Sequence, residues 1–222
     1  MSDVVQLQLG SVVVGLFQTN CYVVGSRRRG EAVCIDPGAD PQTILALARD
    51  LGVRITRVVS THAHLDHVLA VAEVASRTGA PFLLHAADAP LARAVPRMAA
   101  TWLGIDVPPP PPADAALADG DDLEVAGVSL RVLHVPGHTP GSVALYTPGM
   151  LFSGDTLFRS SIGRTDLPGG DPALILRSIT ERLLALPDDT VVLPGHMLQT
   201  TIGEERHTNP FILGELQRRA DR

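Results

Sequence analysis

The seven residues 61–67, Thr-His-Ala-His-Leu-Asp-His, place three imidazoles and a carboxylate directly after an apolar strand. That strand covers residues 54–60, and apolar residues recur at helical spacing over 67–78. Crowding four such side chains into one turn is costly unless a cation binds them, and neutral imidazole with carboxylate suits zinc, iron and manganese. The segment therefore predicts a metal site at a strand-to-helix corner.

Three more ligand-type side chains lie at similar places in the chain. His138 lies in a turn of glycines and prolines, Asp155 follows the apolar strand 150–153, and His196 follows the strand 190–193. A fold that uses all of these ligands must bring several strand ends to one edge of its sheets. We therefore expect the loops at one rim to converge on a site with enough ligands for two metal ions.

The spacing inside the first cluster divides its ligands between two ions. His62 and His64 are two residues apart in an extended segment, so their side chains project to the same side and can bind one ion together. Asp66 and His67 are adjacent and diverge, which suits a second ion beside the first. If Asp66 is not a metal ligand, it is expected to be the N-cap of a helix that begins at the next residue. If Asp155 is not a metal ligand, it is expected to form an Asx-turn at the end of its strand.

The hydrophobic periodicity predicts one α/β domain over residues 1–222. Strands are expected at 4–9, 12–17, 21–25, 32–36, 54–60, 81–85, 122–126, 128–135, 142–147, 150–153 and 190–193. Helices are expected at 41–51, 67–78, 87–99, 171–186 and 203–220, the last interrupted near Pro210. Two packed sheets with helices outside are the simplest architecture that buries every apolar face. The five prolines at 108–112 predict a stiff extended surface loop.

Composition and charge argue against several other classes of protein. The net charge of −6 argues against a nucleic-acid binder, which normally has a basic patch. No basic residue precedes Arg27, so a signal peptide is not expected, and no apolar run is long enough to span a bilayer. Cys21 and Cys34 are interpreted as buried thiols of a reducing compartment, with one disulfide as the alternative. The cytoplasm is the expected location.

The basic side chains are all arginine, because the chain contains no lysine. A lysine Schiff base is therefore excluded as a catalytic device. Any anionic group of a substrate must be bound by arginine, by a neutral donor or by the backbone.

The ligand pattern and its flanking motifs resemble a known family. The motif His62-x-His64-x-Asp66-His67, followed by Gly137-His138, Gly154-Asp155 and Gly195-His196, resembles the metallo-β-lactamase superfamily. The segments 19–22 (TNCY), 35–38 (IDPG), 154–158 (GDTLF), 162–166 (IGRTD) and 201–206 (TIGEER) resemble glyoxalase II, the hydroxyacylglutathione hydrolases, and its short relatives. The resemblance covers residues 12–211 and implies an αββα sandwich of two mixed β-sheets with the site at the sheet edge.

The resemblance also implies a role for each ligand-type residue. His62, His64 and His138 would hold one metal, Asp66, His67 and His196 the other, and Asp155 would bridge them. Asp36 resembles the family's carboxylate that orients a ligand histidine. The implied cofactor is a pair of divalent ions, zinc first, with iron or manganese as alternatives.

The expected activity is hydrolysis of a small-molecule thioester linked to glutathione, such as S-D-lactoylglutathione. Two cations about 3.5–4 Å apart would lower the pKa of a shared water enough to make hydroxide at neutral pH, which would attack the thioester carbonyl. Asp66 would help to orient this nucleophile. Arg164, with Arg159, is the candidate contact for the substrate's carboxylate, the alternative being that both arginines are simply solvated.

Two features of the chain depart from the glyoxalase II pattern. Larger members have a C-terminal helical domain that supplies basic contacts to glutathione, and this chain ends too early to contain it. The glycine and proline that usually follow the last metal histidine are Met197 and Leu198 here. Both departures leave the predicted metal ligands intact and affect only the expected identity of the substrate.

Other functions on the same fold are also compatible with parts of the sequence. A persulfide dioxygenase would use one iron held by His62, His138 and Asp155, and residues 163–166 and 204–206 resemble that branch as well. The complete second-site set favours the dinuclear hydrolase instead. A catalytically silent interaction protein should have lost ligands, and this chain keeps them all. A β-lactamase is disfavoured, because no secretion signal is recognised and the flanking motifs indicate thioester chemistry.

Overall fold

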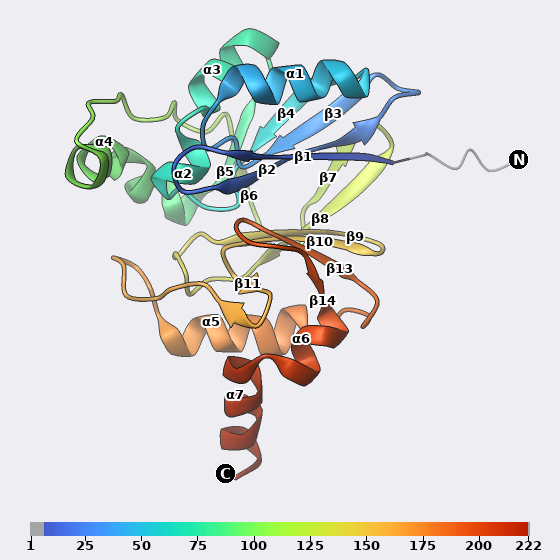
Figure 1. The fold of residues 1–222 in the computed structure, drawn as a ribbon, viewed down its shortest axis with the longest axis vertical. Coiled ribbons are helices and arrows are strands. Elements are labelled where there is room, and N and C mark those ends of the chain that lie inside the picture. Colours follow the sequence, from blue (N-terminus) through green and yellow to red (C-terminus); the bar gives the residue numbers. More distant parts are fainter. Residues whose placement is uncertain (1–6, 222) are drawn as a thin grey trace, which may run out of the picture.

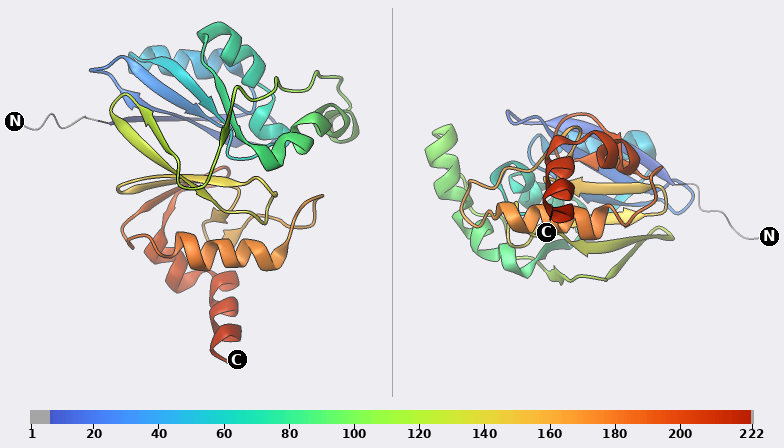
Figure 2. Two further views of the ribbon diagram at one scale, coloured as in Figure 1. Left: turned by 180° about the vertical axis from the view of Figure 1, so that it is seen from behind. Right: turned by 90° about the horizontal axis from the view of Figure 1, so that it is seen from below.

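The structure is a computed structural model that describes residues 7–221 of the chain. Across these residues, two mixed sheets of six strands each face one another, and helices cover both outer faces (Figures 1 and 2). The expected αββα sandwich is therefore confirmed. None of the described helices is long and apolar enough to cross a membrane.

The first sheet has the order β1-β2-β3-β4-β5-β6. Its first three strands are antiparallel and joined by short turns, whereas β3 to β6 are parallel. Since the carboxyl ends of parallel strands share an edge, the segments that follow β3 and β4 emerge together. The strands are β1 (Gln8–Val14), β2 (Thr19–Ser26), β3 (Glu31–Ile35), β4 (Arg54–Val59), β5 (Phe82–His85) and β6 (Ala115–Leu117).

The second sheet has the order β14-β13-β10-β9-β8-β7. Its strands β10 and β13 are parallel, so the residues after them leave the sheet at the same edge. A short hairpin, β11 (Leu157–Phe158) with β12 (Ser161–Ile162), follows β10. The strands of the sheet are β7 (Asp122–Val125), β8 (Val128–His134), β9 (Val143–Thr147), β10 (Met150–Gly154), β13 (Val191–Pro194) and β14 (Thr200–Thr201).

The helices form the two outer layers (Figure 1). On the first sheet lie α1 (Pro41–Leu51) and α3 (Val71–Thr78), and beside them α2 (Leu65–Val68), the 3₁₀ turn η1 (Ala86–Asp88) and α4 (Ala89–Leu103). On the second sheet lie α5 (Pro172–Ser178), which continues as a π-helical turn η2 (Ile179–Leu183), and α6 (Ile202–Thr208). The last helix, α7 (Pro210–Ala220), projects away from the sandwich.

Alternating side chains of the strands fill different apolar layers. On β2, Cys21 and Val23 pack under the helices, whereas Tyr22 and Val24 pack between the sheets. This two-residue period follows from the pleat of a strand that is buried on both faces. The second sheet does the same with its own helices, and both sheets are therefore held rigidly behind their shared edge.

Three predicted elements were wrong in their boundaries. Strands 4–9 and 12–17 were expected to be separated at Gly10, but within the described residues a single strand β1 pairs with β2 without interruption. Gly10 does not make a turn. It lets β1 approach α1, since a Cβ there would lie 2.8 Å from Leu51 Cδ1. The expected helix 67–78 is two helices, because the Ala70 N–H donates to Pro37 O (3.0 Å) where they meet.

Candidate metal centre

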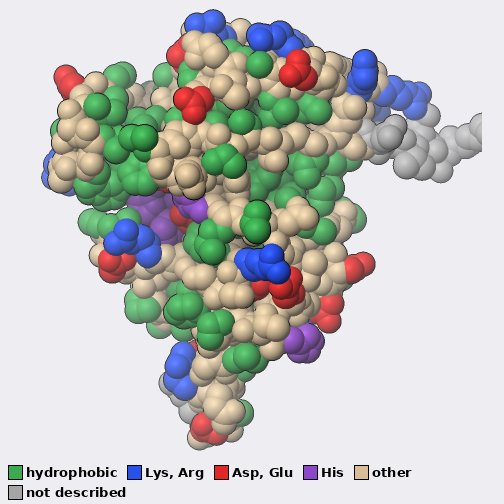
Figure 3. Space-filling view, viewed as in Figure 1, with side chains coloured by type: hydrophobic (Ala, Val, Ile, Leu, Met, Phe, Trp, Pro, Cys, Tyr) green, Lys and Arg blue, Asp and Glu red, His purple; other side chains and the backbone are tan. Residues whose placement is uncertain are grey.

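Loops at one edge of the sandwich bring all seven sequence-predicted ligand residues together. The loop after β4 and the first turn of α2 carry four of them, and the segments after β8, β10 and β13 carry one each. Figure 3 shows histidine side chains in a recess between apolar side chains on this side of the molecule. The seven residues are His62, His64, Asp66, His67, His138, Asp155 and His196. The four histidines His62, His64, His67 and His138 are buried.

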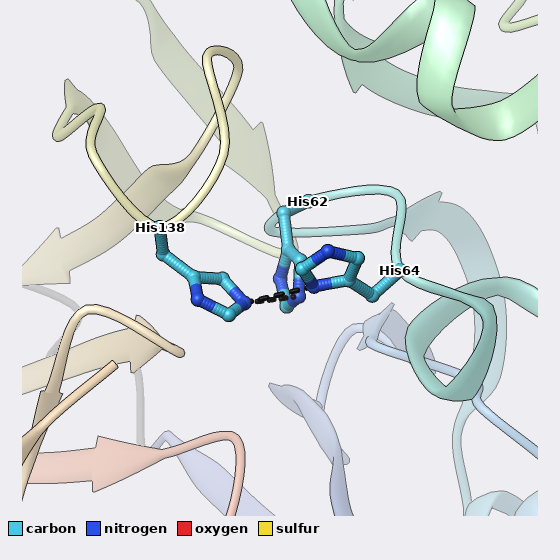
Figure 4. Close-up of side chains that lie close together, drawn as sticks. All are labelled: His62, His64 and His138. Atoms are coloured by element: carbon cyan, nitrogen blue, oxygen red, sulfur yellow. Dashed lines mark hydrogen bonds between the residues drawn. The ribbon is translucent and has the colours of Figure 1, made fainter. Parts of the chain in front are cut away.

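Three imidazoles form the first group (Figure 4). His138 Nε2 lies 2.8 Å from His64 Nδ1 and 3.2 Å from His62 Nε2. The outer nitrogen of His138 donates to Arg164 O at 2.8 Å, which leaves a lone pair on Nε2. Thr61 fixes His62 in the same way, because its hydroxyl donates to Asp36 Oδ2 and accepts from His62 Nδ1 at 3.1 Å. Lone pairs therefore converge on one point, as a cation requires.

The second group contains a carboxylate and two imidazoles. His196 Nε2 lies 3.1 Å from Asp66 Oδ2 and 3.3 Å from His67 Nε2. On its other side, His67 Nδ1 lies 3.1 Å from Asp36 Oδ2, so the expected contact of Asp36 with a ligand histidine is present. The helix α2 begins at Leu65 with His64 at its N-cap position, and the N-cap alternative for Asp66 is therefore wrong.

Asp155 faces both groups. Its Oδ2 lies 3.6 Å from His138 Nε2 and 3.5 Å from His196 Nε2, and its Oδ1 lies 3.5 Å from His67 Nε2. This Oδ1 is buried and has no hydrogen-bond donor among the described residues. A buried carboxylate oxygen without a partner costs free energy, and a divalent ion would offset that cost. The donor set therefore fits a pair of metal ions that share Asp155.

The two groups differ in the protonation that their surroundings favour. Burial, with the neighbouring imidazoles, lowers the pKa of His64 to about 3 and that of His62 well below its ordinary value. Burial also acts to lower the pKa of His67, but the attraction of Asp155, Asp66 and Asp36 raises it to about 10. Burial acts to raise the pKa of the Asp66 carboxyl group, but the adjacent histidines hold it below its usual range. His62 and His64 are therefore neutral without metal, whereas Asp66 and His67 pair opposite charges.

We expect the metal-free protein to be most stable near pH 6.5. The lowered pKa values of His62 and His64 mean that the unfolded chain binds more protons below pH 6.5, so stability falls as the pH falls. The raised pKa of His67 gives stability that is present below pH 6.5 and is lost as the pH rises toward 10. Urea unfolding of chelator-treated protein from pH 5 to 9 measures this maximum. A free energy of unfolding that keeps rising to pH 9 would contradict it.

Close backbone approach makes Gly195 indispensable to this geometry. A Cβ at this position would overlap Asp155 Oδ1 and lie 2.8 Å from His67 Cε1. We expect Gly195→Ala to displace both side chains and to lower the bound metal from two ions to one or none. The matched control is Gly214→Ala in α7, where the added Cβ meets only Arg218 Nη1 at 3.7 Å. Metal analysis of the two purified variants checks this, and full metal content in Gly195→Ala would refute it.

The two arginines predicted to bind substrate are both paired with carboxylates. The Arg164 guanidinium forms a fork with Asp166, with both N–O distances 2.7 Å, while its backbone carbonyl holds His138. Arg159 lies 3.4 Å from Glu204 Oε1. Arg164 is therefore adjacent to the histidine group and exposed, and its carboxylate partner is exchangeable.

Asp88 is a residue of the site that the sequence did not reveal. It is fully buried, and its carboxylate accepts hydrogen bonds from Ala63 N (2.9 Å), Gly141 N (2.7 Å) and Thr139 Oγ1 (2.8 Å). These donors lie on the two loops that carry the histidines of the first group. In the sequence, an aspartate before Ala-Pro indicates only the start of a helix, and nothing in the pattern indicates that Asp88 holds the two loops.

The two cysteines are buried and free. Cys21 Sγ lies 3.6 Å from Cys34 Sγ, a contact between thiols rather than a disulfide.

Two facing sheets with convergent histidines and carboxylates at one edge define a metal-binding hydrolase fold. The chain matches the model of the Metallo-beta-lactamase superfamily over residues 14–196 and belongs to this superfamily. An uncharacterized protein of Aquifex aeolicus is 41% identical over 211 residues, which cover 92% of this chain and 96% of the relative. The hydroxyacylglutathione hydrolase GloC of Haemophilus influenzae is 34% identical over 210 residues, which cover 90% and 96%.

Solved structures share the fold closely. The BLEG-1 B3 metallo-beta-lactamase has a TM-score of 0.86 at 37% identity, covering 92% of this chain and 99% of that one. TTHA1623, solved in a di-iron-bound form, has a TM-score of 0.81 at 42% identity, covering 91% and 99%. ETHE1 from Myxococcus xanthus has a TM-score of 0.77 at 28% identity, covering 93% and 85%.

Proposed function

We propose that the protein is a dinuclear metal-dependent hydrolase of thioesters, with S-(2-hydroxyacyl)glutathione such as S-D-lactoylglutathione as its substrate. The observation that carries the proposal is the position of Asp155, whose carboxylate lies within 3.6 Å of histidines from both groups. Relatives named hydroxyacylglutathione hydrolase support the thioester as substrate. We place the enzyme in the cytoplasm, where its two buried thiols stay reduced, with small molecules as its partners.

The seven clustered residues provide the ligands in this proposal. His62, His64 and His138 would hold the first ion, Asp66, His67 and His196 would hold the second, and Asp155 would contribute to both. Asp36 and Thr61 act behind them by fixing the ring orientations of His62 and His67. When bound, two divalent ions lower the pKa of water and polarise a carbonyl oxygen. We expect zinc, with iron or manganese as alternatives, and a related structure in a di-iron form supports two ions without selecting zinc.

The remaining steps belong to the side chains around the ions. Asp66 stays ionised, and its Oδ2 accepts a hydrogen bond from Thr19 Oγ1 at 3.2 Å. The carboxylate is thereby held where it can accept a hydrogen bond from the attacking water and orient it. Arg164 exchanges Asp166 for the carboxylate of the substrate, with Arg159 as the second candidate. A thiolate is a good leaving group, so the mechanism needs no dedicated acid.

The test is release of free thiol from S-D-lactoylglutathione by metal-replete protein. We expect turnover together with two metal ions per chain. His64→Ala, which removes one nitrogen of the first group, is expected to lose both. Two bound ions without thiol release would contradict the thioester as substrate.

A mono-iron persulfide dioxygenase is the second candidate, supported by the likeness to ETHE1. Its ligands would be His62, His138 and Asp155, of which the last two lie 3.6 Å apart. The convergence of His67 and His196 on Asp66 favours the dinuclear hydrolase, because a mono-iron site would leave this second group unused. Oxygen consumption with glutathione persulfide and one iron per chain would decide for the dioxygenase. A silent interaction protein would show neither activity and would tolerate His64→Ala.

A further inference from the structure

Helix α4 carries two apolar stripes, of which one is buried in the core and the other is only partly buried. Ala92, Val95 and Ala99 are buried against the first sheet and its helices. The adjacent stripe, at helical spacing, is made of Leu91, Ala94, Met98 and Trp102. Trp102 is 44% exposed, which is unusual for the side chain with the largest apolar area.

This second stripe forms one wall of a groove that ends at the metal centre. The groove has a volume of about 350 Å³, and the opposite wall is Leu167 with Pro168. His64 lines it as well, so the groove opens directly on the first histidine group. Figure 3 shows apolar side chains beside the recess that contains the histidines. Among the described residues that line it, the polar ones are His64, Arg97 and Thr101, and none is acidic.

Both walls are fixed relative to the histidines. The start of α4 is tied to the two ligand loops by Asp88, through its bonds to Ala63 N and Gly141 N. The opposite wall follows Arg164, whose carbonyl accepts the bond from His138. The groove is therefore preformed, and little conformational entropy of its walls is lost when a ligand binds.

The groove is larger and more apolar than a lactoyl group requires. A volume of about 350 Å³ corresponds to roughly ten water molecules at about 30 Å³ each. A two- or three-carbon acyl group would leave most of it filled with water against apolar walls. A six-carbon chain or a phenyl ring would displace that water and bury apolar surface.

We propose that this groove binds the acyl group of the substrate, and that the enzyme prefers thioesters whose acyl group is bulky and apolar. The inference rests on the proposed thioesterase function and names its substrate class. A carbonyl bound at the histidine group places its acyl chain beside His64, from which the groove extends along Leu91, Met98 and Trp102. Each fully buried methylene contributes about fourfold in affinity. With about two to three of the five extra methylenes of a hexyl chain buried in the open groove, the hexyl compound is expected to gain about 10- to 100-fold over the methyl compound.

Trp102 provides a readout that does not depend on catalysis, because it is the single tryptophan of the chain. S-hexylglutathione and S-methylglutathione, which have no ester bond to cleave, are titrated into the metal-replete protein while tryptophan emission is followed. We expect the hexyl compound to change the emission and to bind about 10- to 100-fold more tightly. Equal binding of the two compounds would overturn the inference, whatever the hydrolytic activity.

The matched variants are Ala94→Phe, which fills the groove, and Ala100→Phe, which adds the same ring to an exposed position of the same helix. We expect Ala94→Phe to reduce the preference for S-hexanoyl- over S-acetylglutathione in kcat/KM to about twofold or less, and Ala100→Phe to keep the wild-type preference. A full preference in folded Ala94→Phe would overturn the inference. Tight S-hexylglutathione binding without hydrolysis of any thioester would contradict the proposed function and support the groove as the apolar subsite.

Discussion

Asp155→Asn is expected to lower kcat/KM by about 10³-fold or more, because metal stabilisation of the transition state is worth several kcal/mol. The substitution keeps the size of the side chain and removes its negative charge. It therefore takes away the charge of a carboxylate that faces both ligand groups and whose Oδ1 is buried without a hydrogen-bond donor among the described residues. We expect the variant to bind one ion or none, as measured by elemental analysis of protein reconstituted with excess metal.

A comparison with chelated protein separates this role from a purely structural one. Metal that binds only the folded state raises the midpoint of thermal unfolding. We expect a large metal-induced shift in the wild type and a much smaller one in Asp155→Asn. Asp122→Ala, an exposed carboxylate at the start of β7, serves as the control and should behave as wild type. Normal metal content in Asp155→Asn would show that Asp155 does not bridge the ions.

The αββα fold and the seven-residue cluster were predictable because their signals are local. A run of apolar residues, a turn and a histidine or aspartate recur after β4, β10 and β13. Parallel pairing then places such ends at one edge: β3 with β4, and β10 with β13. Because the carboxyl ends of parallel strands lie at the same edge of a sheet, the convergence of these side chains can be expected from the sequence alone.

The features that escaped prediction depend on contacts between distant segments. Gly10 resembles a turn residue, and only the packing of α1 on β1 explains it as a point of close approach. The strands β6, β11, β12 and β14 have two or three residues each, too few for an alternating pattern to show. Whether the second stripe of α4 is covered likewise depends on a loop some seventy residues later, Leu167 with Pro168.

Asp88→Asn is expected to destabilise the fold strongly, although Asp88 is not one of the clustered ligand residues. The wild-type carboxylate accepts three hydrogen bonds, and an amide must turn its NH₂ group toward at least one of these donors. Leaving a buried donor without an acceptor costs about 1–3 kcal/mol, and two donor groups facing each other add to that cost. We expect a loss of about 3 kcal/mol in the free energy of unfolding, measured by urea titration.

The charge of Asp88 contributes little to this effect, which makes the choice of variant important. Burial raises the pKa of Asp88, although its three hydrogen bonds act to lower it, so folding does not favour the ionised form of the carboxyl group. Asp88 therefore stabilises the fold through its position as a hydrogen-bond acceptor rather than through its charge. The control is Asp114→Asn, whose carboxylate accepts the Phe82 N–H at the other end of β5 and is exposed. Because Asp88 joins both histidine loops to α4, a shift of these loops of about 1 Å is expected to lower kcat/KM about 10²-fold in Asp88→Asn but not in Asp114→Asn. Wild-type activity in a destabilised Asp88→Asn would show that the loops keep their positions without it, and that Asp88 serves stability alone.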